Sequence, residues 1–379
     1  MKKKLLYIDH SFHNKTKSAQ FLEELLCSAY DVETCDFDPY DKNPDIIFDS
    51  FTGRDFDVLV LFQVMPNIKK LKEQISFKYP VFFPMFDASG GLDDAFWEQY
   101  REFNIINFSY SLHKRLLKLG LSSYYIQYFP KPIETFDFGD PAHVFFWQRV
   151  TDLGIDMVEK LLKKNSYNRI HLHRVLDPFQ TFRSPSRCIA DKVEYSDWYD
   201  TREEMLKDVE SCAFYIAPRL YEGIGMSFLE AMAMGRCVIA PNFPTMNEYI
   251  VHGENGFLYD YHYPKSIRIN NIDRIQKNAY EYVKEGYAQW EVNKYKILDW
   301  LEAPLGGSVP LPMEKQKKEF IIKKYTFCGK FPLLILESKP YKRYYKLFGS
   351  WCVWKCKRKG NKIIFYLFGF IPVWKASYW

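Results

Sequence analysis

The sequence predicts an α/β fold with two doubly wound parallel sheets, followed by a basic tail. Two observations carry this prediction: apolar strand-like runs alternate with amphipathic helical segments twice along the chain, and a proline-containing stretch separates the two series. A length of 379 residues also exceeds what one hydrophobic core ordinarily serves. We therefore expect an N-terminal domain at 1–135, a second domain at 136–302 and a repeat tail at 313–379.

The first series starts with the apolar run KLLYID and ends before the stretch FPKPIETFDFGDP at 129–141. Prolines and turn residues in that stretch are typical of an interdomain linker. The expected strands are 4–9, 56–62, 79–87, 104–109 and 122–130, and the expected helices are 18–30, 69–75, 93–103 and 110–120.

The second series repeats the same alternation, and a second linker, APLGGSVPLP at 303–312, follows it. The expected strands are 143–148, 168–175, 213–218, 236–241 and 256–260, and the expected helices are 154–164, 200–212, 227–235, 245–253 and two stretches within 271–302.

Composition narrows the class of protein. The eight cysteines form no C-x-x-C pair, which argues against a zinc site or a disulfide framework and favours reduced thiols. The basic N-terminus leads into an apolar run too short for a signal peptide, and no apolar stretch reaches 18 residues. We expect a cytoplasmic protein.

The tail differs from the body in charge. Residues 315–379 hold 16 Lys and Arg but two acidic residues, whereas the preceding 314 residues hold 36 basic and 45 acidic side chains. Seventeen aromatic residues accompany the basic ones, and Trp, Tyr, Lys and Arg together favour an anionic membrane interface. We expect peripheral attachment to the inner membrane face; an oligomer contact or packing back on the body is the alternative. Nucleic acid is disfavoured because the aromatics cluster with Leu and Ile.

The tail also contains an internal repeat. Gly329, Gly349 and Gly369 are 20 residues apart, and each stands between two apolar, aromatic-rich runs. The pattern predicts three copies of one short element, such as a β-hairpin with the glycine at its turn.

The segment EGIGMSFLEAMAMG at 222–235 carries the main functional signal. Gly223 and Gly225 follow an expected strand and precede an expected helix. Glycines there let the backbone approach a ligand, and the first helical amides with the helix dipole favour an anion, most often phosphate.

Two glutamates flank this anion site. Glu222 lies in the loop at the carboxyl edge of the sheet, and Glu230 lies in the helix, so both can face one crevice. Two structural alternatives stay open. Ser227 and Glu230 match a capping box, and Glu222 could be a solvated loop carboxylate.

The segment from 222 to 260, EGIGMSFLEAMAMGRCVIAPNFPTMNEYIVHGENGFLYD, resembles glycosyltransferase group 1 (family 4) enzymes of the GT-B fold. The shared pattern begins with a Glu, seven residues and a second Glu, followed by Ala-Met and a Gly. A hydrophobic strand, a further Glu and a final Asn-Gly-Phe-Leu come after these. The resemblance implies two Rossmann-like domains facing a cleft, with the acceptor on the side of the N-terminal domain (1–135) and the nucleotide sugar bound mainly by the second domain (136–302). The tail is more distantly similar to basic repeats of some bacterial surface-polysaccharide glycosyltransferases.

The resemblance also implies roles. A nucleotide-sugar donor would transfer its sugar to a glycan or lipid-linked glycan acceptor, with retention, without a metal or another cofactor. Glu222 would contact the transferred sugar and Glu230 the ribose. Backbone amides from Gly223 and Gly225 through Met226 and Ser227 would hold the diphosphate.

The sequence departs from the family pattern at several positions. Arg149 fits the expected diphosphate clamp, but no lysine follows it closely. Phe86 precedes Asp87 where many members have a histidine, so Asp87 is a candidate catalytic residue acting alone. Arg219 could pair with Glu222, with a substrate carboxylate or with a structural partner. These departures leave open a degenerate GT-B protein that binds a nucleotide sugar without transferring it.

Metal ligands are not predicted. The histidines of HLH at 171–173 alternate onto one face of an expected strand, but the sequence suggests no third ligand near them.

Overall fold

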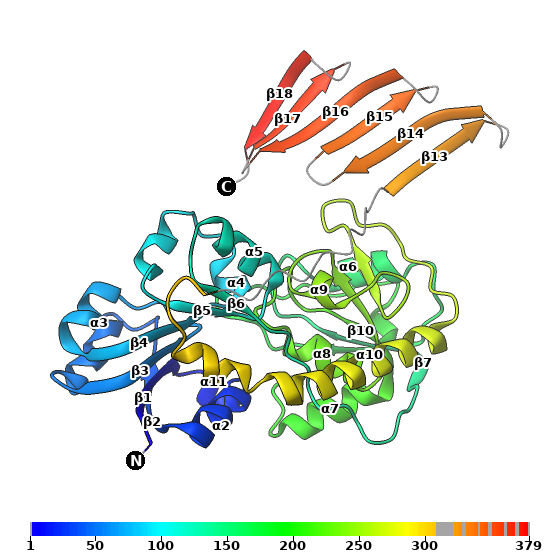
Figure 1. The fold of residues 1–379 in the computed structure, drawn as a ribbon. Helices are drawn as coiled ribbons and strands as arrows, with labels where there is room; N and C mark the ends of the chain where they lie inside the picture. The colour runs from blue at the N-terminus through cyan, green and yellow to red at the C-terminus, as the bar shows by residue number, and fades with distance from the viewer. Residues whose placement is uncertain are drawn as a thin grey trace. The chain divides into compact units, whose positions relative to one another are not determined.

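The computed structural model describes residues 2–307 and six strands of the tail, and the chain divides into two units, 1–309 and 310–379. The first unit holds two six-stranded parallel sheets with helices around them (Figure 1). The second unit holds one antiparallel sheet.

The first sheet has the strand order β2-β1-β3-β4-β5-β6, and each pairing is parallel. Its strands are β1 Lys4–His10, β2 Asp31–Phe37, β3 Asp55–Phe62, β4 Ser76–Phe83, β5 Asn104–Asn107 and β6 Ser123–Tyr125. The helices are α1 His13–Thr16, α2 Gln20–Ala29, α3 Ile68–Gln74, α4 Phe86–Ser89 and α5 Tyr110–Lys118, with 3-10 helices at Pro44–Phe51 and Phe96–Tyr100.

The second sheet has the order β12-β11-β10-β7-β8-β9, again with parallel pairings. Its strands are β7 Asp140–Trp147, β8 Arg169–His173, β9 Val193–Ser196, β10 Cys212–Ile216, β11 Cys237–Pro241 and β12 Phe257–Tyr259. The helices are α6 Ile155–Leu162, α7 Arg202–Ser211, α8 Met226–Ala233, α9 Met246–Tyr249, α10 Ile272–Asn293 and α11 Lys296–Leu301, with a 3-10 helix at Ala190–Lys192.

The central strands are the ones that the sequence predicts. β10 and β11 are continuous apolar runs, and β3 is one from Val58 to Phe62, because helices cover both faces of these strands. Two edge strands were not predicted: β2, with the sequence DVETCDF, and β9, with the sequence VEYS. Each has a neighbour on one side, so it keeps exposed polar positions and has no continuous apolar run.

The helix predicted at 93–103 is wrong in extent. A short 3-10 helix, Phe96–Tyr100, lies within turns there. Trp97 and Tyr100 are fully buried against Phe82 of β4, so packing of large rings, and not helical periodicity, fixes this segment.

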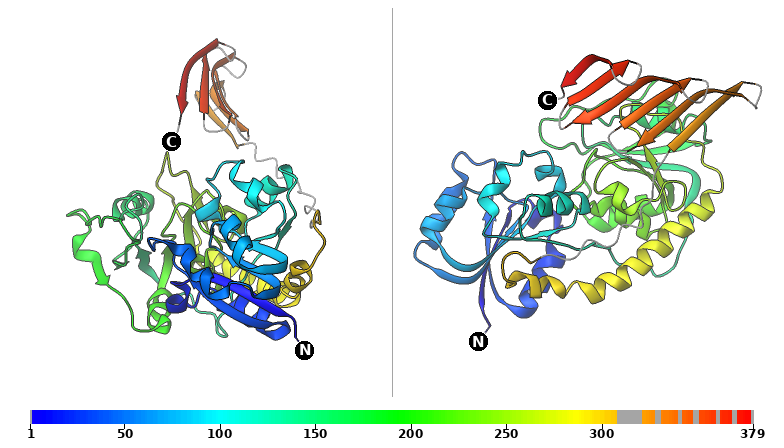
Figure 2. Two further views of the ribbon diagram at one scale, coloured as in Figure 1. Left: turned by 90° about the vertical axis from the view of Figure 1, so that its left-hand side faces the viewer. Right: turned by 45° about the horizontal axis from the view of Figure 1, so that its top comes forward.

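The long helix α10 and the short α11 carry the chain back from the second sheet to the first (Figure 2). Helix α10 packs on α8 and β11, and α11 packs on β4 and β5. Asn104 of β5 donates to the carbonyl of Ala303 at 2.7 Å, and Tyr30 donates to Glu302 at 2.8 Å. These two hydrogen bonds hold the segment after α11 against the first sheet.

Glu248, in α9 beside the second sheet, caps a helix of the first sheet. Its carboxylate accepts hydrogen bonds from the amides of Tyr110 and Ser111 at 2.7 and 2.9 Å, and from the hydroxyl of Ser109 at 3.0 Å. These groups form the N-terminus of α5, where a carboxylate also complements the helix dipole. The contact therefore joins the two sheet regions.

The tail strands pair antiparallel in chain order, within the residues described there. Gly329, Gly349 and Gly369 lie outside the described residues, between β13 and β14, β15 and β16, and β17 and β18, respectively. The strands are β13 Ile321–Phe327, β14 Phe331–Lys339, β15 Lys342–Leu347, β16 Trp351–Lys359, β17 Lys362–Leu367 and β18 Ile371–Ser377. Among the described residues, no helix is long and apolar enough to cross a bilayer.

The cap made by Glu248 predicts a stability effect. Glu248→Ala removes the acceptor of three hydrogen bonds and should lower the free energy of unfolding by about 1–3 kcal/mol. Glu248→Gln, which keeps one acceptor oxygen, should lose less. Urea unfolding followed by circular dichroism measures both variants. Equal stability of Glu248→Ala and the wild-type protein would contradict a stabilising role for this cap.

Candidate active site

The second sheet has its topological switch point between β7 and β10. The chain leaves β7 toward β8 on one side and leaves β10 toward β11 on the other. In open α/β sheets, the crevice outside such a point is where ligands bind. Arg149 follows β7 by two residues, and Arg219 follows β10 by three, so both arginines lie at this crevice.

The loop after β10 leads directly into α8. Gly225 is the N-cap residue, with a left-handed backbone (φ +85°), and a side chain there would collide with the ring of Phe228. No side chain from the described residues caps α8, so the amides of its first turn, which begins at Met226 and Ser227, keep their hydrogen-bonding capacity. The helix start is thus arranged as an anion site.

Glu222 is buried, and its Oε1 has no hydrogen-bond partner among the described residues. Its backbone amide donates to the carbonyl of Pro244 at 3.2 Å, which fixes the loop. Burial raises the pKa of Glu222 to about 7, although the nearby guanidinium groups of Arg219 and Arg149 oppose this rise. The alternative of a solvated loop carboxylate is therefore wrong.

Asp177 connects the two arginines. Its Oδ1 accepts from Arg149 at 2.8 and 3.0 Å, and its Oδ2 accepts from Arg219 at 2.5 and 2.9 Å. The ring of Trp147 lies 4.4 Å below the Arg149 guanidinium and adds a cation–π contact. Both guanidinium groups are thus held side by side at the switch point.

Arg219 also reaches the first sheet. Its third nitrogen lies 3.2 Å from Oδ2 of Asp87, in α4 just after β4. Burial would lower the pKa of Arg219, but Glu222, Asp177 and Asp87 together raise it, so the guanidinium stays charged. Arg219 therefore pairs with two aspartates, and its influence on Glu222 is electrostatic.

Asp87 sits where the two sheet regions touch. A Cβ placed on Gly223 would come within 2.8 Å of the Met85 Cβ and 3.0 Å of Asp87 Oδ1. A glycine at 223 is therefore needed for this close approach. Burial raises the pKa of Asp87, and Arg219 opposes this rise. The structure brings Asp87, Glu222, Gly223 and Arg149 into one site.

Glu230 lies in α8 and is buried. Its carboxylate accepts a hydrogen bond from Arg202, at the start of α7, and not from the helix N-terminus. The capping-box alternative is thus wrong, because the N-cap is Gly225 and Ser227 lies inside the helix. Burial raises the pKa of Glu230, and Arg202 partly offsets this rise.

Two residues of the site were not found from the sequence. Asp177 offered a usable signal, since it follows the strand expected at 168–175 on the sheet that carries Arg149. Arg202 offered none. Its contact with Glu230 depends on how α7 and α8 are placed around β10, which local sequence does not encode.

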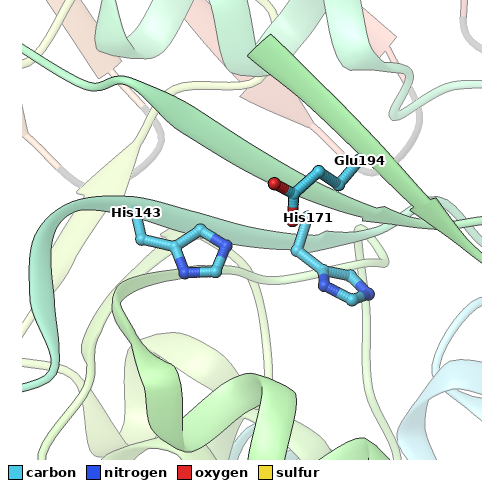
Figure 3. Close-up of side chains that lie close together, drawn as sticks. All are labelled: His143, His171 and Glu194. Atoms are coloured by element: carbon cyan, nitrogen blue, oxygen red, sulfur yellow. The ribbon is translucent and has the colours of Figure 1, made fainter.

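A second polar group lies on another part of the second sheet, where His143, His171 and Glu194 come from three adjacent strands (Figure 3). Their potential ligand atoms lie within 4.8 Å of one another. However, Arg169 donates to Nδ1 of His143 at 2.8 Å and lies 3.8 Å from Glu194. In the neutral ring, Nδ1 is thus an acceptor already engaged by Arg169 and the proton lies on Nε2, so neither nitrogen offers a free lone pair to a cation. The geometry favours a hydrogen-bonded polar layer over a metal site.

Comparison with known proteins supports the interpretation of the second sheet. A sequence model described as "Glycosyl transferases group 1" matches residues 146–273, the segment that contains both arginines, Asp177 and both glutamates. This match covers the part of the site that the second sheet carries, whereas Asp87, the first sheet and the tail lie outside it.

Two solved structures share the arrangement of both sheets. The apo form of the lipopolysaccharide outer core galactosyltransferase WaaB is 12% identical, with 79% of this chain and 98% of that chain covered and a TM-score of 0.51. Sucrose-phosphate synthase from Thermosynechococcus elongatus is 13% identical, with the same coverage and TM-score. At this identity the likeness concerns the fold, which is the GT-B arrangement of two doubly wound parallel sheets.

The buried Glu222 carboxyl predicts a pH-dependent stability effect. Its pKa of about 7 lies above the unfolded value of 4.5, so the folded protein holds this proton more tightly, and the site loses stability as pH rises between these values. Glu222→Gln removes a cost of at most about 3 kcal/mol above pH 7 and nearly none below pH 4.5. The variant's gain in Tm should therefore be larger at pH 8 than at pH 5. Equal effects at both pH values would contradict the raised pKa.

Proposed function

We propose that this protein is a glycosyltransferase that moves a sugar from a nucleotide-sugar donor to a glycan or lipid-linked glycan acceptor, with retention, in bacterial surface polysaccharide synthesis. The observation that carries the proposal is the set of groups at the β7–β10 switch point. There, a helix N-terminus and two arginines accompany a buried carboxyl, Glu222. The family match over 146–273 supports the reaction class.

In this proposal the α8 amides and the two arginines bind the donor's diphosphate. A helix N-terminus contributes about half a positive charge, and guanidinium groups bind phosphate oxygens in a bidentate manner. Arg149 is the clamp that the resemblance implies. Arg219 provides the second cation in place of the lysine missing after Arg149, because Asp177 holds both guanidinium groups together. Such fixed groups stabilise a leaving diphosphate without a metal.

The two glutamates have separate tasks in this proposal. Glu222, next to the arginines, contacts hydroxyl groups of the transferred sugar, and its partnerless Oε1 leaves an acceptor position for them. Glu230 accepts hydrogen bonds from the ribose after exchanging its contact with Arg202. Asp87 borders the same site from the first sheet.

The rival function is nucleotide-sugar binding without transfer. A thermal-shift screen of UDP-, GDP-, ADP- and CMP-sugars identifies the donor. An assay of released nucleotide then separates the two functions, because a binding protein would release none from a donor that it binds.

The proposed roles predict different effects of two conservative variants. Glu222→Gln should largely abolish transfer and leave nucleotide affinity nearly unchanged. Glu230→Gln should weaken nucleotide binding by about 1–3 kcal/mol, because a charged hydrogen-bond acceptor is lost. Isothermal titration and transfer assays measure both. The role of Glu230 fails if its variant loses stability and keeps full affinity.

The proposed diphosphate site also predicts that transfer survives EDTA, since helix amides and arginines carry the charge that a metal would otherwise neutralise. Initial rates are compared before and after chelation and after Mg²⁺ or Mn²⁺ is restored. Loss on chelation with recovery on adding metal would overturn this mechanism.

We propose in addition that the tail, residues 315–379, attaches the enzyme to an anionic membrane surface. Its 16 basic residues contribute up to about 1 kcal/mol each near such a surface. A contact between copies of the chain is the rival role.

The membrane role predicts that the full chain co-sediments with anionic vesicles and that high salt weakens this binding. A chain ending at Pro312 should stay in solution and still bind donor nucleotide. Equal partitioning of the two proteins would refute the membrane role. A salt-insensitive oligomer lost with the tail would support the rival.

A further inference from the structure

The first sheet has a switch point of its own, between β1 and β3. The chain leaves β1 toward β2 on one side and leaves β3 toward β4 on the other. Asp9 lies at the carboxyl end of β1, and His13 follows in α1. The crevice outside a switch point is a general ligand position in open α/β sheets, yet the roles proposed above involve neither residue.

Asp9 is held in place by a set of hydrogen bonds. The His13 Nδ1 lies 2.6 Å from Asp9 Oδ1, which also accepts from the amide of His10 at 2.7 Å. The hydroxyl of Tyr7 donates to the other carboxylate oxygen at 3.3 Å. Asp9 itself is 9% exposed, so a short buried network fixes this carboxylate.

The network determines which way His13 can act. A carboxylate on Nδ1 keeps the proton of the neutral ring there, which leaves Nε2 as a hydrogen-bond acceptor. Nε2 has no hydrogen-bond partner within the part of the chain that the structure describes. The ring packs edge-on against Phe62 at the end of β3, with ring centroids 5.7 Å apart. His13 is thus an oriented acceptor without a protein donor.

The segment around His13 faces the second sheet region. The Lys15 ammonium lies 4.0 Å from the ring centroid of Trp198, which follows β9. Asp87, after β4 on the same carboxyl edge as Asp9, pairs with Arg219. The carboxyl edge of the first sheet therefore meets the second sheet region at two places, and His13 lies on that edge.

Exposed aromatic rings accompany this polar pair. Phe12 is 48% exposed, Tyr40 is 73% exposed, and Trp198 is 50% exposed. Tyr40 packs near His10, with ring centroids 6.0 Å apart, and Trp198 is tied to Lys15. Rings of this kind offer apolar faces for a sugar, while an oriented acceptor such as His13 Nε2 can bind one of the sugar's hydroxyl groups.

We propose that Asp9 and His13 form the acceptor subsite, in which His13 Nε2 accepts a hydrogen bond from the hydroxyl of a sugar acceptor and the Trp198 ring packs on that sugar. The proposal rests on the function proposed above.

The test compares two reactions of one donor, the one selected by the thermal-shift screen. Hydrolysis uses water as acceptor, and transfer uses octyl β-D-glucopyranoside. His13→Phe keeps a ring against Phe62 but removes the acceptor nitrogen. His252→Phe, at an exposed histidine between α9 and β12, is the matched control. Donor affinity is measured for each protein by titration calorimetry.

His13→Phe should slow both hydrolysis and transfer to the glucoside by roughly ten-fold, as expected for one lost hydrogen bond. The affinity for the donor should be unchanged. The control should match the wild-type protein. The proposal would be overturned if His13→Phe kept both rates. It would also be overturned if the variant lost donor affinity by the same factor as it lost rate. A wild-type protein that binds no donor would contradict the proposed function instead.

If His13→Phe does not fold, Trp198→Ala decides the matter, because Trp198 lies at the surface. The proposal then requires that Trp198→Ala raises the KM for a sugar acceptor. Transfer to the glucoside should be slower, or the glucoside should no longer compete with water. The rate of hydrolysis should be unchanged. Equal behaviour of Trp198→Ala and the wild-type protein toward the glucoside would overturn it.

Discussion

The bridge that Asp177 makes between Arg149 and Arg219 is the interaction on which the rest of the site depends. Two guanidinium groups repel each other. The Asp177 carboxylate offers one oxygen to each of them, and these two attractive contacts offset the repulsion. Because Arg219 also contacts Asp87, the same bridge links the second sheet region to the first. Removing one partner from so enclosed a network would leave charge uncompensated.

The network also explains why Glu222 has an unusual environment. Asp177 and Asp87 already balance the two arginines, so the buried Glu222 carboxyl gains less from them than it would from free cations. A bound diphosphate would change that balance, since it competes with the aspartates for the same guanidinium groups. Glu230 and Arg202 present a similar case. In the proposed function, donor binding exchanges partners among groups that are already satisfied, which limits the desolvation cost.

Much of this arrangement could be predicted from the sequence, and the parts that could not have a common cause. Central strands such as β10, and β3 from Val58 to Phe62, are continuous apolar runs, so their sequences identify them. The Glu222–Gly225 loop and Glu230 were recognisable because they lie within one continuous segment. Strand order or a short loop places the partners through which three features act: Asp177, Arg202 and the Asp9–His13 pair. The strands β2 and β9 were missed because they are polar edge strands. Local pattern does not contain these relationships.

The central claim is that Arg149 and Arg219 together bind the donor's diphosphate. The most direct measurement compares the affinity of the selected nucleoside diphosphate with that of its nucleoside, for the wild-type protein, Arg149→Met and Arg219→Met. The account predicts that each variant weakens the diphosphate by about ten-fold or more and leaves the nucleoside unchanged, because only the phosphate contacts are lost. Unchanged diphosphate affinity in both variants would contradict it.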